Sequence, residues 1–259
     1  MHALRTTPGL GRLAFLILLG CVACACGTSS AASSRSIVAL GDSVPHGQNC
    51  SCTPYPELSA GGLSKSTGKS VKATNDSVSG YTSTNVLAQL KDNTNVIDHV
   101  RAADAIEIEI GANDVGYNKS CGTTVSCYTP HMPALKENLA AIVKRVKELT
   151  AGHKALVVLL DYWSVWLGGS YAKAHGDSYV AAAEEMTDQV DTAIKNAAKQ
   201  SGSAYVDLRA AFKGPGYDLD ETRYLATDGD HPNAAGHEQI AKATDDVIEK
   251  TLHISRTAR

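Results

Sequence analysis

Five short apolar segments, separated by longer stretches with helical patterns, constrain the fold of this chain more than any other feature. The expected strands are 36–44, 71–78, 105–110, 155–160 and 204–208. The fourth is apolar throughout, as in strands that are buried on both faces of a sheet. Strands that alternate with helices imply right-handed crossovers and a parallel sheet covered on both sides. The sequence therefore predicts one α/β domain, a three-layer α/β/α sandwich with roughly five parallel strands.

Helices are expected between these strands, at 82–90, 94–102, 133–149, 179–200 and 233–252. In the third helix the apolar residues repeat at helical spacing on one face: Leu135, Leu139, Ile142, Val143, Val146 and Leu149. We expect His237 on the exposed face of the last helix.

The segment 45–70 is rich in Gly, Pro, Ser and Cys, and it predicts a loop-rich insertion with a short helix starting near residue 55. The strand 105–110 alternates Ile and Glu, so one of its faces is expected to meet polar groups.

The first 26 residues have the pattern of an export signal. Arg5 and Arg12 are followed by an apolar run at 13–19, and then by small residues and cysteines. That run is too short for a lasting transmembrane helix. Residues 27–35 are small and polar, which is typical of a flexible tether. The folded domain is therefore expected at 36–259.

Two cysteines near the end of this signal indicate a lipid anchor. Residues 18–21 resemble a bacterial lipobox ending in Cys21, and the residues around Cys26 form a looser version. Residues 23–25 also fit the small-x-small site of ordinary signal cleavage. We expect an exported protein that is either a cell-surface lipoprotein, attached through Cys21 or Cys26, or freely secreted.

Four cysteines remain after the signal: Cys50, Cys52, Cys121 and Cys127. An even number in an exported chain suggests disulfides, and four cysteines allow three connectivities. Cys121 and Cys127 close a small loop and are the expected pair, which leaves Cys50 and Cys52 to each other across one serine. A metal site is the alternative, but no histidine stands at zinc-finger spacing beside them. We therefore expect no metal.

The charge balance argues against one class of partner. The chain has 24 Lys and Arg against 27 Asp and Glu, a net charge of −3. It contains no basic block or stripe, so nucleic acid is not an expected partner.

A serine follows the first strand at the edge where open α/β sheets bind ligands. Gly41 allows a sharp turn after the apolar run 37–40, and Ser43 lies just beyond the end of that run. A serine hydroxyl is a weak nucleophile, so it needs a general base that is oriented by an acid. The oxyanion formed by attack on a carbonyl also needs hydrogen-bond donors.

Candidates for the general base, the orienting acid and the oxyanion donors occur later in the chain. Asp228 and His231 are three residues apart, so the carboxylate can hold one imidazole nitrogen while the other faces Ser43. The alternative is a helix N-cap beside a surface histidine. Gly80 and Asn113 follow the second and third strands, where a backbone N–H and a side-chain amide can donate. Their alternatives are an ordinary turn and an Asx turn.

The residues 41–43, Gly80, 111–114 and 228–231 resemble, in order and spacing, the four blocks of the SGNH hydrolases, also called GDSL esterases/lipases. The resemblance covers 36–252 and is greatest to secreted single-domain bacterial lipases that carry disulfides. It implies that Ser43 is the nucleophile, His231 the base and Asp228 the orienting acid. It also implies an oxyanion hole formed by the N–H groups of Ser43 and Gly80 and the amide of Asn113. Val44 departs from the usual leucine.

The expected function is an exported serine hydrolase that cleaves carboxylic esters through an acyl-enzyme, without a cofactor. Its expected partner is an ester substrate, an acyl lipid or acylated carbohydrate, and we expect a monomer. Tyr162, Trp163 and Trp166 follow the fourth strand and form either an apolar acyl-binding wall or a cap on the core. The alternatives are a deacetylase or acyltransferase of envelope carbohydrate or lipid, and a non-enzymatic surface protein.

Overall fold

Five parallel strands form one sheet within residues 34–254, which are the residues that the computed structural model describes. The strands are β1 (Arg35–Gly41), β2 (Val71–Asn75), β3 (Ala105–Glu109), β4 (Leu156–Leu160) and β5 (Ala204–Val206). All neighbouring strands are parallel, which confirms the predicted sheet. The expected export signal 1–26, with Cys21 and Cys26, and most of the tether 27–35 lie outside the described residues.

The strand order reverses at β1. The order is β2-β1-β3-β4-β5, so the chain adds β2 on one side of β1 and then crosses over to add β3 on the other. In an open α/β sheet, ligands bind at the carboxyl ends of the strands beside such a reversal. Ser43 lies two residues after the end of β1, and Asn113 follows β3, so both lie at this edge.

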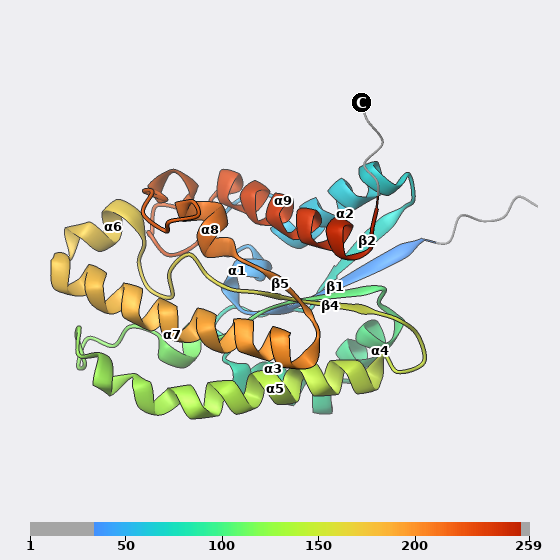
Figure 1. Ribbon diagram of the computed structural model, residues 1–259, viewed down its shortest axis with the longest axis horizontal. Coiled ribbons are helices and arrows are strands. Elements are labelled where there is room, and N and C mark those ends of the chain that lie inside the picture. Colours follow the sequence, from blue (N-terminus) through green and yellow to red (C-terminus); the bar gives the residue numbers. More distant parts are fainter. Residues whose placement is uncertain (1–33, 255–259) are drawn as a thin grey trace, which may run out of the picture. The chain divides into compact units, whose positions relative to one another are not determined.

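Helices cover both faces of the sheet (Figure 1). On one face lie α2 (Tyr55–Thr67), α8 (Leu208–Lys213) and α9 (Ala234–Thr251); on the other lie α3 (Ser83–Asp92), α4 (Thr94–Ala102), α5 (Met132–Leu149) and α7 (Asp177–Ser201). The connections contain the short helices α1 (Ser43–His46) and α6 (Gly169–Ala174) and the 3₁₀ turns η1 (Ala112–Val115), η2 (Val125–Cys127), η3 (Thr129–His131) and η4 (Thr222–Tyr224). None of the helices in the described part of the chain is long and apolar enough to cross a membrane.

The predicted helices are confirmed, with α4 at the expected bounds and the others shifted by one or two residues at their ends. The apolar face of α5 is buried as its periodicity predicts, and Leu139 is 1% exposed. β4 is buried from Val157 to Leu160, with Leu159 and Leu160 fully enclosed. This continuous apolar strand therefore lies inside the sheet, as expected.

The segment 45–70 contains the expected helix, α2, which begins at Tyr55. At 13 residues the helix is half of the segment, so the segment is less loop-rich than predicted. Pro56 occupies the first turn, where its missing N–H is tolerated, and Gly68 ends the helix in the left-handed conformation. Gly62 has a packing role, since a Cβ there would lie 2.0 Å from Oδ2 of Asp245 on α9. This glycine, which resembles a loop residue in the sequence, lets α2 and α9 approach closely.

The face of α9 that meets α2 also buries His237. This histidine is fully enclosed, so the expectation that it lies on an exposed face is wrong. Its Nδ1 accepts a hydrogen bond of 3.2 Å from the backbone N–H of Tyr55. Burial, together with the charge of His231, lowers the pKa of His237 to about 4, so the ring is neutral near pH 7.

The two glutamates of β3 are also buried beneath α2. Ser59 donates a hydrogen bond of 3.2 Å to Oε1 of Glu107, and Tyr55 lies next to Glu109. Burial raises the pKa of Glu107 to about 8 and that of Glu109 well above its usual range. The Ile/Glu alternation therefore places neutral acids against polar residues of α2, as the sequence indicated.

Candidate active site

The position of Ser43 is set by a tight turn between β1 and α1. A Cβ on Gly41 would lie 2.1 Å from the backbone carbonyl oxygen of Glu109, so only glycine fits there. Asp42 caps α1 by accepting a 3.0 Å hydrogen bond from the N–H of Val44. Ser43 is therefore the first residue of the helix, where its backbone N–H has no carbonyl partner within the helix.

A continuous chain of hydrogen bonds runs from Ser43 to Asp228. Nε2 of His231 lies 2.9 Å from Oγ of Ser43, and its Nδ1 lies 2.7 Å from Oδ2 of Asp228. Because a carboxylate only accepts, Nδ1 donates and Nε2 is left to accept the serine proton. The arrangement suits proton transfer from Ser43 to a histidine held in one tautomer.

Asp228 is held by donors on both of its oxygens. Oδ1 accepts the backbone N–H groups of Asp230 at 3.0 Å and His231 at 3.1 Å. Oδ2 accepts from His231 and, at 2.5 Å, from Nδ2 of Asn49. Partial burial raises the pKa of Asp228, but the hydrogen bonds from Asn49, His231 and the backbone outweigh it and lower the pKa to about 2. The carboxylate is therefore ionised near pH 7.

Asn49 is a site residue that the sequence analysis missed. It lies 179 positions from Asp228, in a segment without a recognisable motif. An asparagine beside two cysteines carries no signal for a contact so distant in the chain. Only the folded loop brings the two side chains together.

The two expected oxyanion donors follow β2 and β3, the strands on either side of β1. Nδ2 of Asn113 donates to the carbonyl oxygen of Tyr81 at 2.9 Å, which leaves its second N–H for another acceptor. Gly80 precedes Tyr81 in the turn after β2, has a φ of 81°, and has open space beside its Cα. Asn113 lines the cavity beside Ser43, whereas Gly80 lies outside the cavity lining.

A cavity of about 550 Å³ opens beside Ser43. Half of its lining residues are aromatic or aliphatic: Val44, Ala112, Tyr117, Tyr162, Trp163, Val165, Trp166, Leu167 and Tyr179. Trp163 lines the cavity and also covers the core, because it stacks on Phe212 with the ring centroids 4.3 Å apart. Trp166 packs edge-on against Tyr117 at 5.1 Å and forms the aromatic side of the cavity. The cavity can therefore accept an apolar group next to the serine.

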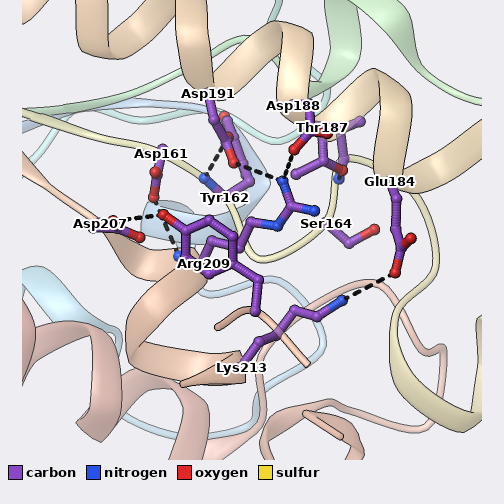
Figure 2. Close-up of polar contacts among 12 residues, drawn as sticks. Asp161, Tyr162, Ser164, Glu184, Thr187, Asp188, Asp191, Asp207, Arg209 and Lys213 are labelled. Carbon is purple, nitrogen blue, oxygen red and sulfur yellow. Dashed lines mark hydrogen bonds and ion pairs between the residues drawn. The ribbon is translucent and has the colours of Figure 1, made fainter. Parts of the chain in front are cut away.

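The loop after β4, which carries this wall, is fixed from behind by a polar network (Figure 2). Asp191 of α7 accepts the N–H of Tyr162 at 3.2 Å and pairs with Arg209, which also contacts Asp188. Thr187 accepts the N–H of Val165 at 3.1 Å. α7 therefore holds the segment from Tyr162 to Val165 in place.

The four cysteines of the domain pair as Cys50–Cys52 and Cys121–Cys127. Within residues 34–254, the one group of three side chains placed to hold a metal ion is Cys50, Cys52 and His237. The disulfide engages both sulfur atoms of that group, so they do not offer thiolates to a metal.

The fold and the site together define an α/β/α hydrolase with a serine, histidine and aspartate array at the carboxyl edge of its sheet. The chain belongs to the GDSL-like lipase/acylhydrolase family, whose model matches residues 39–239. It is therefore a carboxylic ester hydrolase. No curated protein matches the sequence.

Several solved structures share the fold at low sequence identity. A lipase from a goat rumen metagenome, Lip_vut3, is 18% identical with a TM-score of 0.64; the match covers 82% of this chain and 97% of the lipase. The acetylxylan esterase Axe2 of Geobacillus stearothermophilus is 22% identical with a TM-score of 0.61, over 83% of this chain and 94% of the esterase. A putative GDSL-like lipase from Parabacteroides merdae is 19% identical with a TM-score of 0.59, over 82% and 94%.

Proposed function

We propose that this protein is an exported esterase in which Ser43, His231 and Asp228 hydrolyse carboxylic esters through an acyl-enzyme. The observation that carries the proposal is the unbroken chain of contacts at 2.9 Å and 2.7 Å from Ser43 through His231 to Asp228. This series of hydrogen bonds ends at Ser43, which lines the cavity, so a substrate carbonyl can reach its Oγ.

In the first half of the reaction, Oγ of Ser43 attacks the ester carbonyl carbon while Nε2 of His231 takes its proton. Asp228 stabilises the imidazolium that forms. The oxyanion accepts hydrogen bonds from the N–H groups of Ser43 and Gly80 and the free amide N–H of Asn113. His231 then returns its proton to the leaving alkoxide. Water, with His231 again as base, hydrolyses the acyl-enzyme.

The cavity lining favours an acyl chain longer than acetyl. An acetyl group occupies only a small part of about 550 Å³, and each methylene buried against apolar side chains contributes about 0.8 kcal/mol. We therefore propose an acyl lipid as substrate. Deacetylation of carbohydrate is the second candidate, favoured by Tyr117, an aromatic side chain at the cavity that is 39% exposed and can stack on a sugar.

Export rests on the signal pattern of residues 1–26 and on the cysteine pairs, which suit an oxidising compartment. We propose a monomer that is either anchored to the membrane through a lipidated Cys21 or Cys26, or freely secreted. Mass spectrometry of the processed N-terminus distinguishes the two.

The test uses protein starting at Ser33 and p-nitrophenyl esters of increasing chain length. The parent should hydrolyse them, with the best rate beyond acetyl, and Ser43→Ala should not. Ser70→Ala, which alters an exposed serine just before β2, is the matched control and should retain the parent rate. Hydrolysis that persists in folded Ser43→Ala would contradict the assignment of the nucleophile.

A further inference from the structure

Asn49 shares an oxygen of Asp228 with the histidine of the site. Its Nδ2 lies 2.5 Å from Oδ2 of Asp228, the same atom that His231 approaches at 2.7 Å. The two side chains approach this oxygen from separate segments of the chain. The direction of the carboxylate, and with it the orientation of the imidazole, therefore depends on where Asn49 is held.

The loop that carries Asn49 has an unusual backbone. Asn49 has a φ of 59° and Ser51 a φ of 48°, both in the left-handed region. This conformation costs roughly 1–2 kcal/mol for a residue with a Cβ, although asparagine tolerates it best. The disulfide between Cys50 and Cys52 closes a ring across Ser51, and the N–H of Gln48 bonds to the carbonyl of Ser43 at 3.0 Å. The loop is therefore held on the N-terminal side of Asn49 by this hydrogen bond and on its C-terminal side by the disulfide.

His237 lies against this disulfide. The ring is fully buried, and one of its nitrogens lies within 4.8 Å of the sulfur atoms of both Cys50 and Cys52. Nδ1 accepts the N–H of Tyr55, so the proton of the neutral ring is on Nε2, which has no hydrogen-bond partner within residues 34–254. A buried ring here gives the disulfide a rigid backing from α9.

We propose that Asn49 is a positioning residue for ester hydrolysis, and that the Cys50–Cys52 disulfide, packed against His237, holds it in the position from which it orients Asp228. This inference rests on the proposed function of Ser43, His231 and Asp228. Asn49 is outside the cavity lining, so it acts on the rate of the chemical step and not on substrate binding.

Two substitutions separate the donor role of Asn49 from its role in the loop. Asn49→Asp has the same shape and tolerates the left-handed backbone, but it presents a second carboxylate where Asp228 needs a donor. Asn49→Gly suits the backbone and has no side chain. Both should lower kcat by about 10-fold to 100-fold, as for loss of one hydrogen bond to a charged group, with KM unchanged. In Asn49→Asp the acid limb of the rate profile should move to higher pH, because the adjacent carboxylates hold a proton more tightly.

Gln48→Glu is the matched control, since it adds the same charge one residue away, and it should keep the parent kcat. Replacing both Cys50 and Cys52 by Ser should reproduce the loss seen in Asn49→Gly, and combining the two changes should add little. Replacing Cys121 and Cys127 by Ser should instead combine additively with Asn49→Gly.

A second readout does not depend on an ester. The proton on Nδ1 of His231, held by Asp228, should give a low-field NMR signal in the parent that shifts upfield in Asn49→Asp and Asn49→Gly. If the parent hydrolyses no ester, the proposed function fails while this signal still tests the positioning role. If both variants keep the parent kcat, or keep the parent signal, the proposal is overturned.

Discussion

The hydroxyl of Tyr162 donates a 2.6 Å hydrogen bond to Oδ2 of Asp42, which lies 120 positions earlier in the chain. The contact joins the loop after β4, which forms a wall of the cavity, to the turn that presents Ser43. Both residues are buried, at 1% exposure each. One hydrogen bond therefore connects the wall of the cavity to Asp42, the N-cap of α1.

Tyr162→Phe should destabilise the protein more at pH 8 than at pH 4. Burial raises the pKa of Asp42 from 3.8 to about 6, with the bond from Tyr162 limiting the rise. A raised carboxyl pKa means that the folded state favours the protonated form, so stability falls as the pH rises from about 4 to about 6. Removing the donor raises that pKa further and increases the loss at high pH.

Urea unfolding at the two pH values measures this difference. A loss of about 1.5–3 kcal/mol is expected at pH 8 and a smaller one at pH 4. Tyr81→Phe removes the same atom from a half-buried tyrosine and should show no such pH dependence. Equal losses for Tyr162→Phe at both pH values would contradict the prediction.

Asp228→Asn should lower kcat by roughly 10³-fold to 10⁴-fold, because an amide can donate to Nδ1 of His231 and stabilise the wrong tautomer. Asp230→Asn gives the comparison, since its carboxylate lies 4.0 Å from the same nitrogen, and its loss should be much smaller. Steady-state kinetics on one ester measures both. If Asp230→Asn lowered kcat more than Asp228→Asn, Asp230 would be the residue that orients His231.

Tyr117→Ala should weaken binding of long acyl esters selectively. Tyr117 packs on Trp166 and Tyr179 with ring centroids 5.1 Å away in each case. Losing this surface should raise KM for long chains about 10-fold, as expected for about 1.4 kcal/mol of apolar contact, while acetyl esters change little. The ratio of kcat/KM values across the ester series is the measurement. A larger effect on acetylated xylooligosaccharides would instead favour deacetylation.

Gly41→Ala should be among the most destabilising single changes. Its Cβ would lie 2.1 Å from a backbone oxygen of β3, at a φ of 159°. Relief requires movement of β1 against β3, which should cost about 3 kcal/mol or more. Gly202→Ala is the control, because its φ of 64° is also positive but the space around it is open. Thermal melts should show a cost of only about 1 kcal/mol for Gly202→Ala.

Local pattern was sufficient for most of the architecture. Continuous apolar runs identified β1 and β4, and the 3.6-residue repeat of α5 identified its buried face, because both patterns arise from which side of one element is removed from water. The strand assignments also predicted that Ser43 and Asn113 lie at one edge of the sheet, because the carboxyl ends of parallel strands lie together. The pattern of residues 228–231 depends only on contacts three positions apart, so Asp228 and His231 could be paired from the sequence.

Tertiary packing decided what the local pattern could not. The glycines of α2 resembled a loop, but Gly62 makes room for Asp245 of α9. His237 had the spacing of a surface residue, yet it is enclosed between α2, α9 and the Cys50–Cys52 ring. Sequence patterns alone were sufficient to identify the strands, most of the helices and the residues at the carboxyl edge of the sheet. Only the folded chain decided which distant side chains meet there, such as Asn49 with Asp228, because such contacts depend on how whole elements pack and leave no periodic trace along the chain.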